Sequence, residues 1–157
     1  MILAALLSGC GYSLVQKTGA LYDKNLKVDL FVNRSFQPDL EAVLRKAIIA
    51  ELVARGIRPV SGDAVLGITG SIDRVESQAV AYSANDKTML NRVSITISAE
   101  LVDKQSARLL WKGAETLSQD YPATTDIALQ KNSRDAAVYG ICQAISRVLV
   151  TKMSQNF

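Results

Sequence analysis

The stretch Arg92-Val93-Ser94-Ile95-Thr96-Ile97-Ser98-Ala99-Glu100-Leu101 decides the fold, because polar and apolar side chains alternate along it without interruption. Successive side chains of a β-strand point to opposite faces of the sheet, so strict alternation predicts a strand with one packed face and one polar face. This arrangement is typical of an antiparallel sheet that is covered on one side only. We therefore expect a sheet whose second face stays polar and uncovered.

A long strand is predicted before this stretch and is joined to it by a turn. The strand begins at Ala64 and continues through Val75 towards Tyr82, and one of its faces carries Leu66, Ile68, Gly70 and Ile72. Because glycine inside a strand often marks an irregularity, we expect a bulge at Gly70. The turn is predicted at residues 84–87, which read Ala-Asn-Asp-Lys.

Another strand is predicted after the alternating stretch, beyond a second polar turn. The expected register places Leu109 opposite Leu101, so that Leu109 and Trp111 enter the core. This register later stops matching the apolar pattern, and we therefore expect a bulge at Gly113. The dipeptide Tyr121-Pro122 ends the strand, because proline restricts the residue before it.

The chain before residue 57 predicts one further strand and a helix. Residues 26–33 alternate and place Leu26, Val28, Leu30 and Val32 on one face. Pro38 at a first helical position, followed by acidic residues, predicts the start of the helix. Its apolar stripe consists of Leu40, Val43, Leu44, Ala47, Ile48 and Leu52. Arg55 and Gly56 are typical of a helix end.

A second helix is predicted at the end of the chain, with Ser133 as its N-cap. Its apolar stripe consists of Val138, Ile141, Cys142, Ile145, Val148 and Leu149. Gly140 lies inside this helix, at a cost of about 1 kcal/mol relative to alanine, and indicates close packing. Residues 123–132 are compatible either with a loop or with a frayed first turn of the helix.

The predicted order of elements is β-α-β-β-β-α, which places the chain in the α+β class. The two amphipathic helices lie side by side on one face of a four-stranded mixed sheet and form a two-layer sandwich with it. With 157 residues, the chain is long enough for one domain with a real core. We assign residues 24–157 to this domain.

The start of the chain carries a separate signal. An apolar run leads into Leu7-Ser8-Gly9-Cys10, which resembles the lipobox of bacterial lipoproteins. The resemblance implies that Cys10 is lipidated with acyl chains such as palmitate and that residues 10–23 form a lipidated tether. Residues 1–9 then represent a truncated signal peptide, since they lack a basic residue and the usual apolar length of about 7–15 residues. The alternative is a short buried apolar strand with a core cysteine.

Composition argues against most kinds of catalysis. The chain has no histidine, which excludes Ser-His-Asp and Cys-His catalysis and most zinc sites. It has no Gly-rich phosphate loop and no Cys/His cluster. The net charge of +3 permits an acidic or phosphorylated partner without demanding one. We expect no enzyme activity, no metal, no cofactor and no nucleic-acid partner, and we interpret Cys142 as a small buried apolar residue.

Several ordered segments resemble the lipopolysaccharide-assembly lipoprotein family, LptE. They are Cys10-Gly11-Tyr12-Ser13-Leu14, Val28-Asp29-Leu30-Phe31-Val32-Asn33, Asn91-Arg92-Val93, and Leu101-Val102-Asp103 followed by Leu110-Trp111. The predicted order of strands and helices agrees with the family over nearly the whole chain. The resemblance implies a lipid-anchored protein on the periplasmic face of the outer membrane of a Gram-negative bacterium. Gly11 after the cysteine likewise favours the outer membrane.

The family implies a role in binding and assembly without a chemical reaction. Its members resemble plugs inside the large outer-membrane barrel protein LptD, assist the assembly of that barrel, and bind lipopolysaccharide during its insertion into the outer leaflet. A plug in a polar barrel lumen needs a polar face. We therefore expect Ser94, Thr96, Ser98 and Lys112, on the uncovered sheet face, to face the barrel.

Basic side chains are the candidates for binding lipopolysaccharide, because its phosphates and acidic sugars attract them. Arg92 matches the family's Arg-Val position, and Arg74 and Lys87 are expected near it on the long hairpin. The alternative is that these are ordinary solvated charges on a strand. Tyr82 and Trp111 could also touch a ligand, although a tryptophan in this pattern is more often a core residue.

Two other interpretations remain open at this point. Periplasmic assembly or secretion lipoproteins of the TolB N-terminal or curli-secretion type share a lipidated start followed by a strand, a helix and a strand, and would bind a protein partner. An auxiliary lipoprotein of an inner-membrane lipid transporter is the other possibility. An enzyme would need a serine-lysine or carboxylate arrangement, and no spacing in the chain supports one.

Overall fold

The computed structural model describes residue 21, residues 24–85 and residues 87–155. The expected signal segment 1–9, the lipidation site Cys10 and the expected tether apart from Leu21 lie outside the described residues. Leu21 is buried in the core, with 2% of its surface exposed. Leu21 therefore packs as part of the domain.

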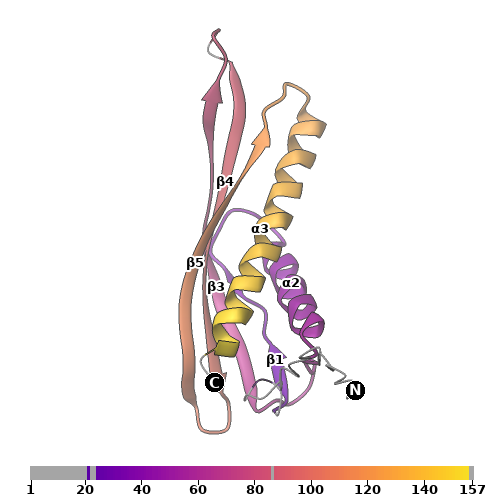
Figure 1. Cartoon of the computed structure of the whole chain (residues 1–157), viewed down its shortest axis with the longest axis vertical. Coiled ribbons are helices and arrows are strands. Elements are labelled where there is room, and N and C mark those ends of the chain that lie inside the picture. Colours follow the sequence, from indigo (N-terminus) through magenta and orange to yellow (C-terminus); the bar gives the residue numbers. More distant parts are fainter. Residues whose placement is uncertain (1–20, 22–23, 86, 156–157) are drawn as a thin grey trace, which may run out of the picture.

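The described chain forms two layers, a sheet and a pair of helices (Figure 1). In chain order the elements are β1 (Leu26–Val28), β2 (Val32–Asn33), α2 (Leu40–Ala54), β3 (Leu66–Tyr82), β4 (Thr88–Asp103), β5 (Arg108–Pro122) and α3 (Ile127–Gln155). The sheet order is β1-β3-β4-β5, and β2 also pairs with β3. β1 and β2 run parallel to β3, whereas β4 is antiparallel to β3 and β5. The predicted two-layer α+β fold with a mixed sheet is confirmed, with the first strand divided into β1 and β2.

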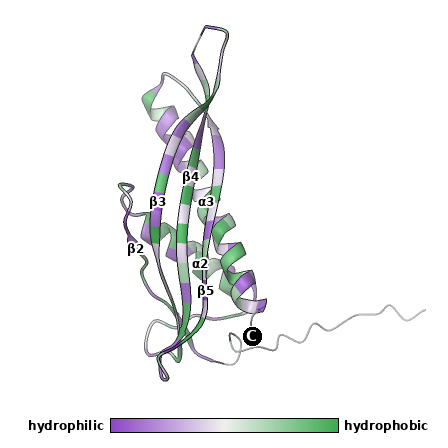
Figure 2. Ribbon diagram, turned by 90° about the vertical axis from the view of Figure 1, so that its left-hand side faces the viewer, coloured by the Kyte–Doolittle hydropathy of each residue, from purple (hydrophilic) through white to green (hydrophobic). Residues whose placement is uncertain are grey.

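β4 lies between two long strands and supplies the centre of the core. The apolar side chains of its alternating stretch are 0% exposed: Val93, Ile95, Ile97, Ala99 and Leu101. Both helices lie behind the sheet in Figure 2, which looks onto the opposite, uncovered face. Burying a side chain as large as valine or isoleucine contributes about 1.5–3 kcal/mol before chain entropy is subtracted. The prediction of one packed and one polar face is confirmed.

One extra residue between β1 and β2 reverses the side-chain pattern expected there. Val28 lies opposite Ile68 and Val32 lies opposite Ser71, so four steps along the edge correspond to three steps along β3. Phe31 is consequently buried, whereas Leu30 and Val32 are 60% and 59% exposed. The prediction that Leu30 and Val32 share the core face was wrong, because a one-residue slip moves every later side chain to the other face.

The bulge predicted at Gly70 occurs at Asp73 instead. Ile72 pairs with Ile97 and Arg74 pairs with Thr96, which leaves Asp73 as the extra residue. Gly70 serves close packing, since a Cβ atom built there would lie 2.6 Å from Cε1 of Phe31 and would clash with the backbone oxygen of Ser98. The missing side chain therefore makes room for the buried phenyl ring of Phe31.

The pairing of β4 with β5 also differs from the expected register. Leu101 lies opposite Trp111, and the irregularity falls at Leu110 while Gly113 pairs normally with Ala99. Leu109 is 51% exposed, whereas Trp111 packs against the core. The predictions of a buried Leu109 and a bulge at Gly113 were wrong, because the extra residue is Leu110, which moves Leu109 to the face opposite to that of Trp111. Four residues close this hairpin, and the last of them, Ala107, has a left-handed φ of 53°.

α2 buries its predicted stripe but begins later than expected. Pro38 precedes the helix, and Asp39 is the N-cap residue with a left-handed φ of 62°. Pro38 therefore does not occupy the first helical position, because the left-handed residue after it interrupts the helical path. The buried residues are Leu40, Leu44, Ala47, Ile48 and Leu52. Gly56 has a φ of 84°, which confirms the predicted helix end at Arg55 and Gly56.

α3 begins at Ile127, six residues before the predicted N-cap Ser133. The carboxylate of Asp126 accepts a hydrogen bond of 3.0 Å from the backbone N–H of Leu129, which is the arrangement of an N-cap. The prediction of Ser133 as the cap was wrong, because Ile127 and Leu129 are exposed and the first turns of the helix contribute no buried stripe. Further along, the predicted stripe is confirmed except at Val148, which is only half-buried. The buried residues are Ala137, Val138, Ile141, Cys142, Ile145, Ser146, Leu149, Val150 and Met153.

Gly140 of α3 allows the helix to lie close to β5, as its position predicted. A Cβ atom built on Gly140 would lie 2.6 Å from Oε1 of Gln119. The C-terminal ends of the two helices are joined by Arg55, which donates hydrogen bonds to Glu51 at 2.7 Å and to Oγ1 of Thr151 at 2.6 Å. α3 therefore packs closely on the sheet and is also hydrogen-bonded to the end of α2.

The packing around Gly70 can be tested with a matched pair of glycine substitutions. Gly70→Ala is expected to lower the free energy of unfolding by about 1–3 kcal/mol, because the added methyl group has no space. Gly62→Ala is the control, since a Cβ atom there meets nothing within 4 Å, and it should change the free energy by less than about 0.5 kcal/mol. Urea denaturation measures both values. Equal stability of the two variants would contradict the packing described for Phe31.

Candidate functional site

The uncovered side of β3, β4 and β5, named here the outer sheet face, carries polar side chains that pair with one another across neighbouring strands. The hydroxyl groups of Ser94 and Ser118 lie 2.7 Å apart, and those of Thr96 and Thr116 lie 2.9 Å apart. Further along, Nζ of Lys112 lies 2.7 Å from Oε1 of Glu100. Because these polar groups satisfy one another, the outer sheet face is polar yet internally ordered.

Arg92 is held at one end of this row by Asp120. Its Nε and one terminal nitrogen donate hydrogen bonds of 2.6 Å and 2.9 Å to the two carboxylate oxygens of Asp120. The hydrogen bond from Arg92 lowers the pKa of Asp120, and the same bond raises the pKa of Arg92. Such two-pronged pairs fix the geometry of both side chains. Two nitrogens of the Arg92 guanidinium are therefore already occupied in the described structure.

The hydroxyl group of Ser98 also has a hydrogen-bond partner, the carboxylate of the bulged residue Asp73. Ser98 and Ser71 donate hydrogen bonds of 2.5 Å and 2.6 Å to Asp73, and a terminal nitrogen of Arg34 lies 3.4 Å away. Burial raises the pKa of Asp73, but the two hydroxyl bonds and the charge of Arg34 outweigh it, so the pKa is lowered overall. The carboxylate is thus kept ionised where the bulge turns it towards β4.

A hollow of about 590 Å³ lies on the outer sheet face beside Asp73. Its lining combines Ser98 and Lys112 with the exposed apolar residues Leu30 and Val32. Of the expected barrel-facing residues, Ser98 and Lys112 therefore border this hollow. Ser94 and Thr96 instead pair with the hydroxyl groups of Ser118 and Thr116. The structure brings all four to one face, and their role in binding stays a prediction.

The far end of the β3–β4 hairpin projects beyond the start of α3 (Figure 1). We name residues 79–85, 87–91 and 123–130 the hairpin end. Among the described residues, Lys87 has no side-chain partner, whereas Arg74 lies 3.2 Å from Glu76. Lys87 also lines a hollow of about 580 Å³ together with Thr88, Met89, Asn91, Ala123, Thr124, Thr125 and Gln130. The structure thus distinguishes Lys87 from the two paired arginines.

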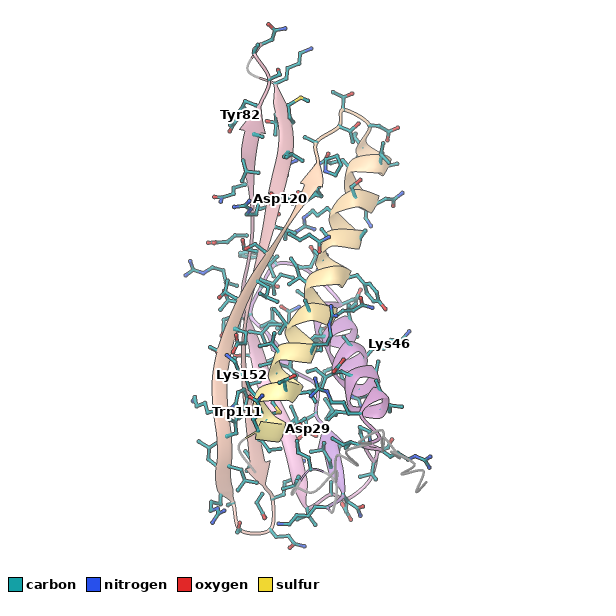
Figure 3. All side chains as sticks on the ribbon, in the orientation of Figure 1. Asp29, Lys46, Tyr82, Trp111, Asp120 and Lys152 are labelled. Carbon is teal, nitrogen blue, oxygen red and sulfur yellow. The ribbon has the colours of Figure 1, made fainter. Side chains whose placement is uncertain are left out.

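Large apolar side chains gather at the same end. The exposed ones are Tyr82, Met89, Leu90, Ile127 and Leu129. Figure 3 shows Tyr82 near the tip, far from Trp111 at the opposite end of the sheet. Tyr82 is therefore accessible to a ligand, as the sequence allowed, whereas Trp111 is a core-packed residue. An accessible cation beside exposed apolar side chains suits a ligand that has an anionic group and hydrocarbon chains.

Sequence reasoning missed Asp120, Ser118 and Thr116 as partners on the outer sheet face. The cause was the expected register, in which β5 was displaced by two residues relative to β4. With Leu101 opposite Trp111, alternation alone would have placed Asp120 opposite Arg92. Met89 and Gln130 at the hairpin end carry no recognisable motif, and only the folded structure brings them together.

The described residues contain no group of three or more His, Cys, Asp or Glu residues that could hold a metal ion. Burial raises the pKa of the Cys142 thiol to about 12, so its reactive thiolate is scarce at neutral pH. Neither helix of the described chain has the length and hydrophobicity that crossing a bilayer requires.

The comparison with protein families gives one match that spans most of the chain. Residues 24–153 match the sequence model of the family described as LptE, lipopolysaccharide-assembly. A search of curated protein sequences gave no significant match. The family match extends from two residues before β1 to the last turn of α3.

Similar solved structures support the fold. The rare lipoprotein B of Shewanella oneidensis superposes with a TM-score of 0.58 at 10% identity, over 81% of this chain and 95% of that one. A lipoprotein of Caulobacter crescentus gives 0.63 at 10% identity, covering 83% and 88%. A protein of Xanthomonas campestris gives 0.64 at 14% identity, covering 88% and 90%. At these identities the likeness concerns the fold alone.

The pair formed by Arg92 and Asp120 predicts a measurable pKa change. In Arg92→Gln, the pKa of Asp120 should rise towards its ordinary value, because the charge-assisted hydrogen bond is lost. A carboxyl whose folded pKa is lowered stabilises the fold above its unfolded pKa and loses this contribution as the pH falls through the folded pKa. The contribution of Asp120 should therefore be smaller in the variant, so the free energy of unfolding should fall less as the pH is lowered through this range.

Titration of the Asp120 carboxyl carbon by nuclear magnetic resonance measures this change. Arg74→Gln is the control, since Arg74 pairs with Glu76 and should leave Asp120 unaffected. An identical Asp120 titration in the wild-type chain and in Arg92→Gln would show that the pair does not persist in solution.

Proposed function

The chain belongs to the LptE family of lipopolysaccharide-assembly lipoproteins, and from this premise we propose that it plugs the large outer-membrane barrel through which lipopolysaccharide is exported. It assists the assembly of that barrel, an LptD-like protein, and binds lipopolysaccharide as it enters the outer leaflet. No bond is made or broken in this role. The observation that carries the proposal is the family match over residues 24–153, and the geometry of two surfaces supports its parts.

The outer sheet face is the surface proposed to contact the barrel. The lumen of a large barrel is polar, and the rows formed by Ser94 with Ser118 and Thr96 with Thr116 present hydroxyl groups to it. Because these groups are already paired, the face is stable in water before the barrel folds around it. Leu30 and Val32, exposed at the edge of this face, supply apolar contacts to the barrel wall.

The hairpin end is the surface proposed to bind lipopolysaccharide. Lys87 provides an unpaired ammonium group for a phosphate, and such charge-assisted hydrogen bonds are short and strong. Tyr82, Met89 and Leu90 provide exposed apolar surface for acyl chains. Arg92 and Arg74 are proposed as secondary contacts, since each would first have to leave an acidic partner.

The proposed location is the periplasmic side of the outer membrane, through acyl chains on Cys10. Each buried methylene group of an acyl chain contributes about 0.8 kcal/mol, so more than one chain gives stable anchoring. β1 begins at the end of the domain opposite to the hairpin end (Figure 1). The anchor would therefore leave the hairpin end pointing away from the leaflet that holds it.

Acylation of Cys10 is tested by metabolic labelling. Cys10→Ser should abolish incorporation of labelled palmitate and release the chain from the membrane fraction, because serine cannot carry the thioether-linked lipid. Cys142→Ser is the matched control and should keep the label, since Cys142 is buried in the core. Palmitate still present in Cys10→Ser would refute the lipidation of this residue.

The role of Lys87 is tested by measuring lipopolysaccharide binding with purified variants. Lys87→Gln should weaken binding about tenfold, the loss expected for one charge-assisted hydrogen bond. Arg58→Gln, which removes an equally exposed charge from the loop after α2, should leave the affinity unchanged. Melting curves of both variants should match the wild-type curve. An unaltered affinity of a folded Lys87→Gln variant would exclude Lys87 from the site.

A further inference from the structure

A groove runs between α2 and α3 on the side of the helix layer that faces away from the sheet. It consists of two adjoining hollows of about 330 Å³ and 560 Å³, and both are lined by Tyr139. We name them together the interhelix groove. The groove is lined by residues from 37–51 and 131–147, which belong to neither the outer sheet face nor the hairpin end, so neither proposed binding surface uses it.

One end of the interhelix groove is positively charged. Lys46 of α2 and Arg147 of α3 line it from opposite sides, and neither side chain has a partner among the described residues. The nearby carboxylate of Glu51 is taken by Arg55 at 2.7 Å. Tyr139 and Gln143 add polar groups that can donate hydrogen bonds. Unpaired cations and donors with no free carboxylate among them suit an anion.

The other end of the interhelix groove is largely apolar. Its lining includes Pro38, Leu40, Val43 and Val138, with the ring of Tyr139 between the two ends. Both cations at this end are already occupied: Lys131 lies 2.6 Å from Asp135, and Arg134 donates a hydrogen bond of 2.6 Å to Gln37. The carboxylate of Asp39 also lines this end and makes no side-chain cap hydrogen bond. The free positive charge is therefore concentrated at Lys46 and Arg147.

We infer that the interhelix groove binds an anionic amphiphile, with its phosphate between Lys46 and Arg147 and one hydrocarbon chain along Leu40, Val43 and Tyr139. The positive end matches the head group, and the apolar end matches the chain. A purely polar anion would leave the apolar end empty, and a cationic amphiphile would meet two unpaired cations. Lys46, labelled in Figure 3, lies on α2 at the rim of this groove.

This site deepens the proposed function, because a phosphorylated acylated glycolipid has the same chemistry as the inferred ligand. Contact at the interhelix groove would give such a lipid a second place on the chain, distinct from Lys87. A single-chain anionic lipid is the other source of that chemistry. The groove itself is defined by its own residues and can be tested without lipopolysaccharide.

The test uses the full chain carrying Cys10→Ser and three small probes below their micelle concentrations. Dodecyl phosphate should shift the amide resonances of Tyr139 and Gln143 and bind saturably. Dodecyltrimethylammonium has the same chain and the opposite charge, and inorganic phosphate has the head group alone, so both should bind at least tenfold more weakly. Equal binding of both dodecyl compounds, or shifts confined to the hairpin end, would overturn the inference.

Matched variants distinguish this site from the proposed one. The double variant Lys46→Gln with Arg147→Gln should weaken dodecyl phosphate binding at least fivefold. Arg58→Gln with Arg108→Gln should not, since it removes two exposed charges elsewhere that have no side-chain partner in the described part of the chain. Lys87→Gln should leave the shifts that dodecyl phosphate causes at Tyr139 and Gln143 unchanged even where it weakens lipopolysaccharide binding. Equal affinity of the two double variants would overturn the inference.

A competition experiment identifies the source of the amphiphile. Displacement of dodecyl phosphate by purified lipopolysaccharide supports the groove as a second contact for that glycolipid. Binding of dodecyl phosphate that lipopolysaccharide does not displace supports a single-chain anionic lipid as the ligand. In both cases the groove is occupied by the inferred chemistry.

Discussion

The burial of one face of β4 is the constraint on which the rest of the structure depends. Val93, Ile95, Ile97, Ala99 and Leu101 are completely enclosed, and α2 and α3 are the elements that cover them. Because strand side chains alternate, the same constraint directs Arg92, Ser94, Thr96, Ser98 and Glu100 to the opposite face. The core and the polar surface therefore arise from a single pattern. A substitution that shifted this strand by one residue would exchange the two faces and remove both.

The polar side chains of the outer sheet face are ordered before any partner binds, which lowers the entropic cost of binding. Side chains that were polar and unpaired would be free to adopt many arrangements, and each partner would have to order them at an entropic cost. Here Thr96 pairs with Thr116, and Arg92 pairs with Asp120, so much of that order exists before binding. The helix layer contributes in a different way, since Lys46 and Arg147, which have no side-chain partner among the described residues, line one end of the interhelix groove. The molecule thus has a preordered polar surface on the outer sheet face. Its accessible positive charge lies at the interhelix groove and at the hairpin end.

The sequence predicted what depends on periodicity and failed where a single residue changes the period. The β4 face, the stripes of both helices and the order of the elements follow from alternation or helical spacing, and they are confirmed. The misplaced residues Leu30, Val32 and Leu109 each lie at or beside an irregularity of one residue, which no local sequence pattern indicates. The start of α3 was missed because its first turns bury no stripe, although Asp126 is an ordinary capping residue. The candidate site was predicted incompletely for the same reason. Arg92 was identified from the sequence, but its partner Asp120 can be assigned only with the true β4–β5 register. The hollow at Lys87 can be recognised only in the folded hairpin.

The central claim is that the outer sheet face, and not the helix layer, contacts an outer-membrane barrel. In-cell photo-crosslinking tests it most directly, with a photo-reactive amino acid placed either at Thr116 on the outer sheet face or at Gln143 on α3. Both positions are accessible from outside the fold, so each can report a neighbour equally well. The account predicts that Thr116 forms a crosslink to one large outer-membrane β-barrel protein, identified by mass spectrometry, and that Gln143 does not. A barrel crosslink from Gln143 alone, or crosslinks from Thr116 only to soluble periplasmic or inner-membrane proteins, would contradict it.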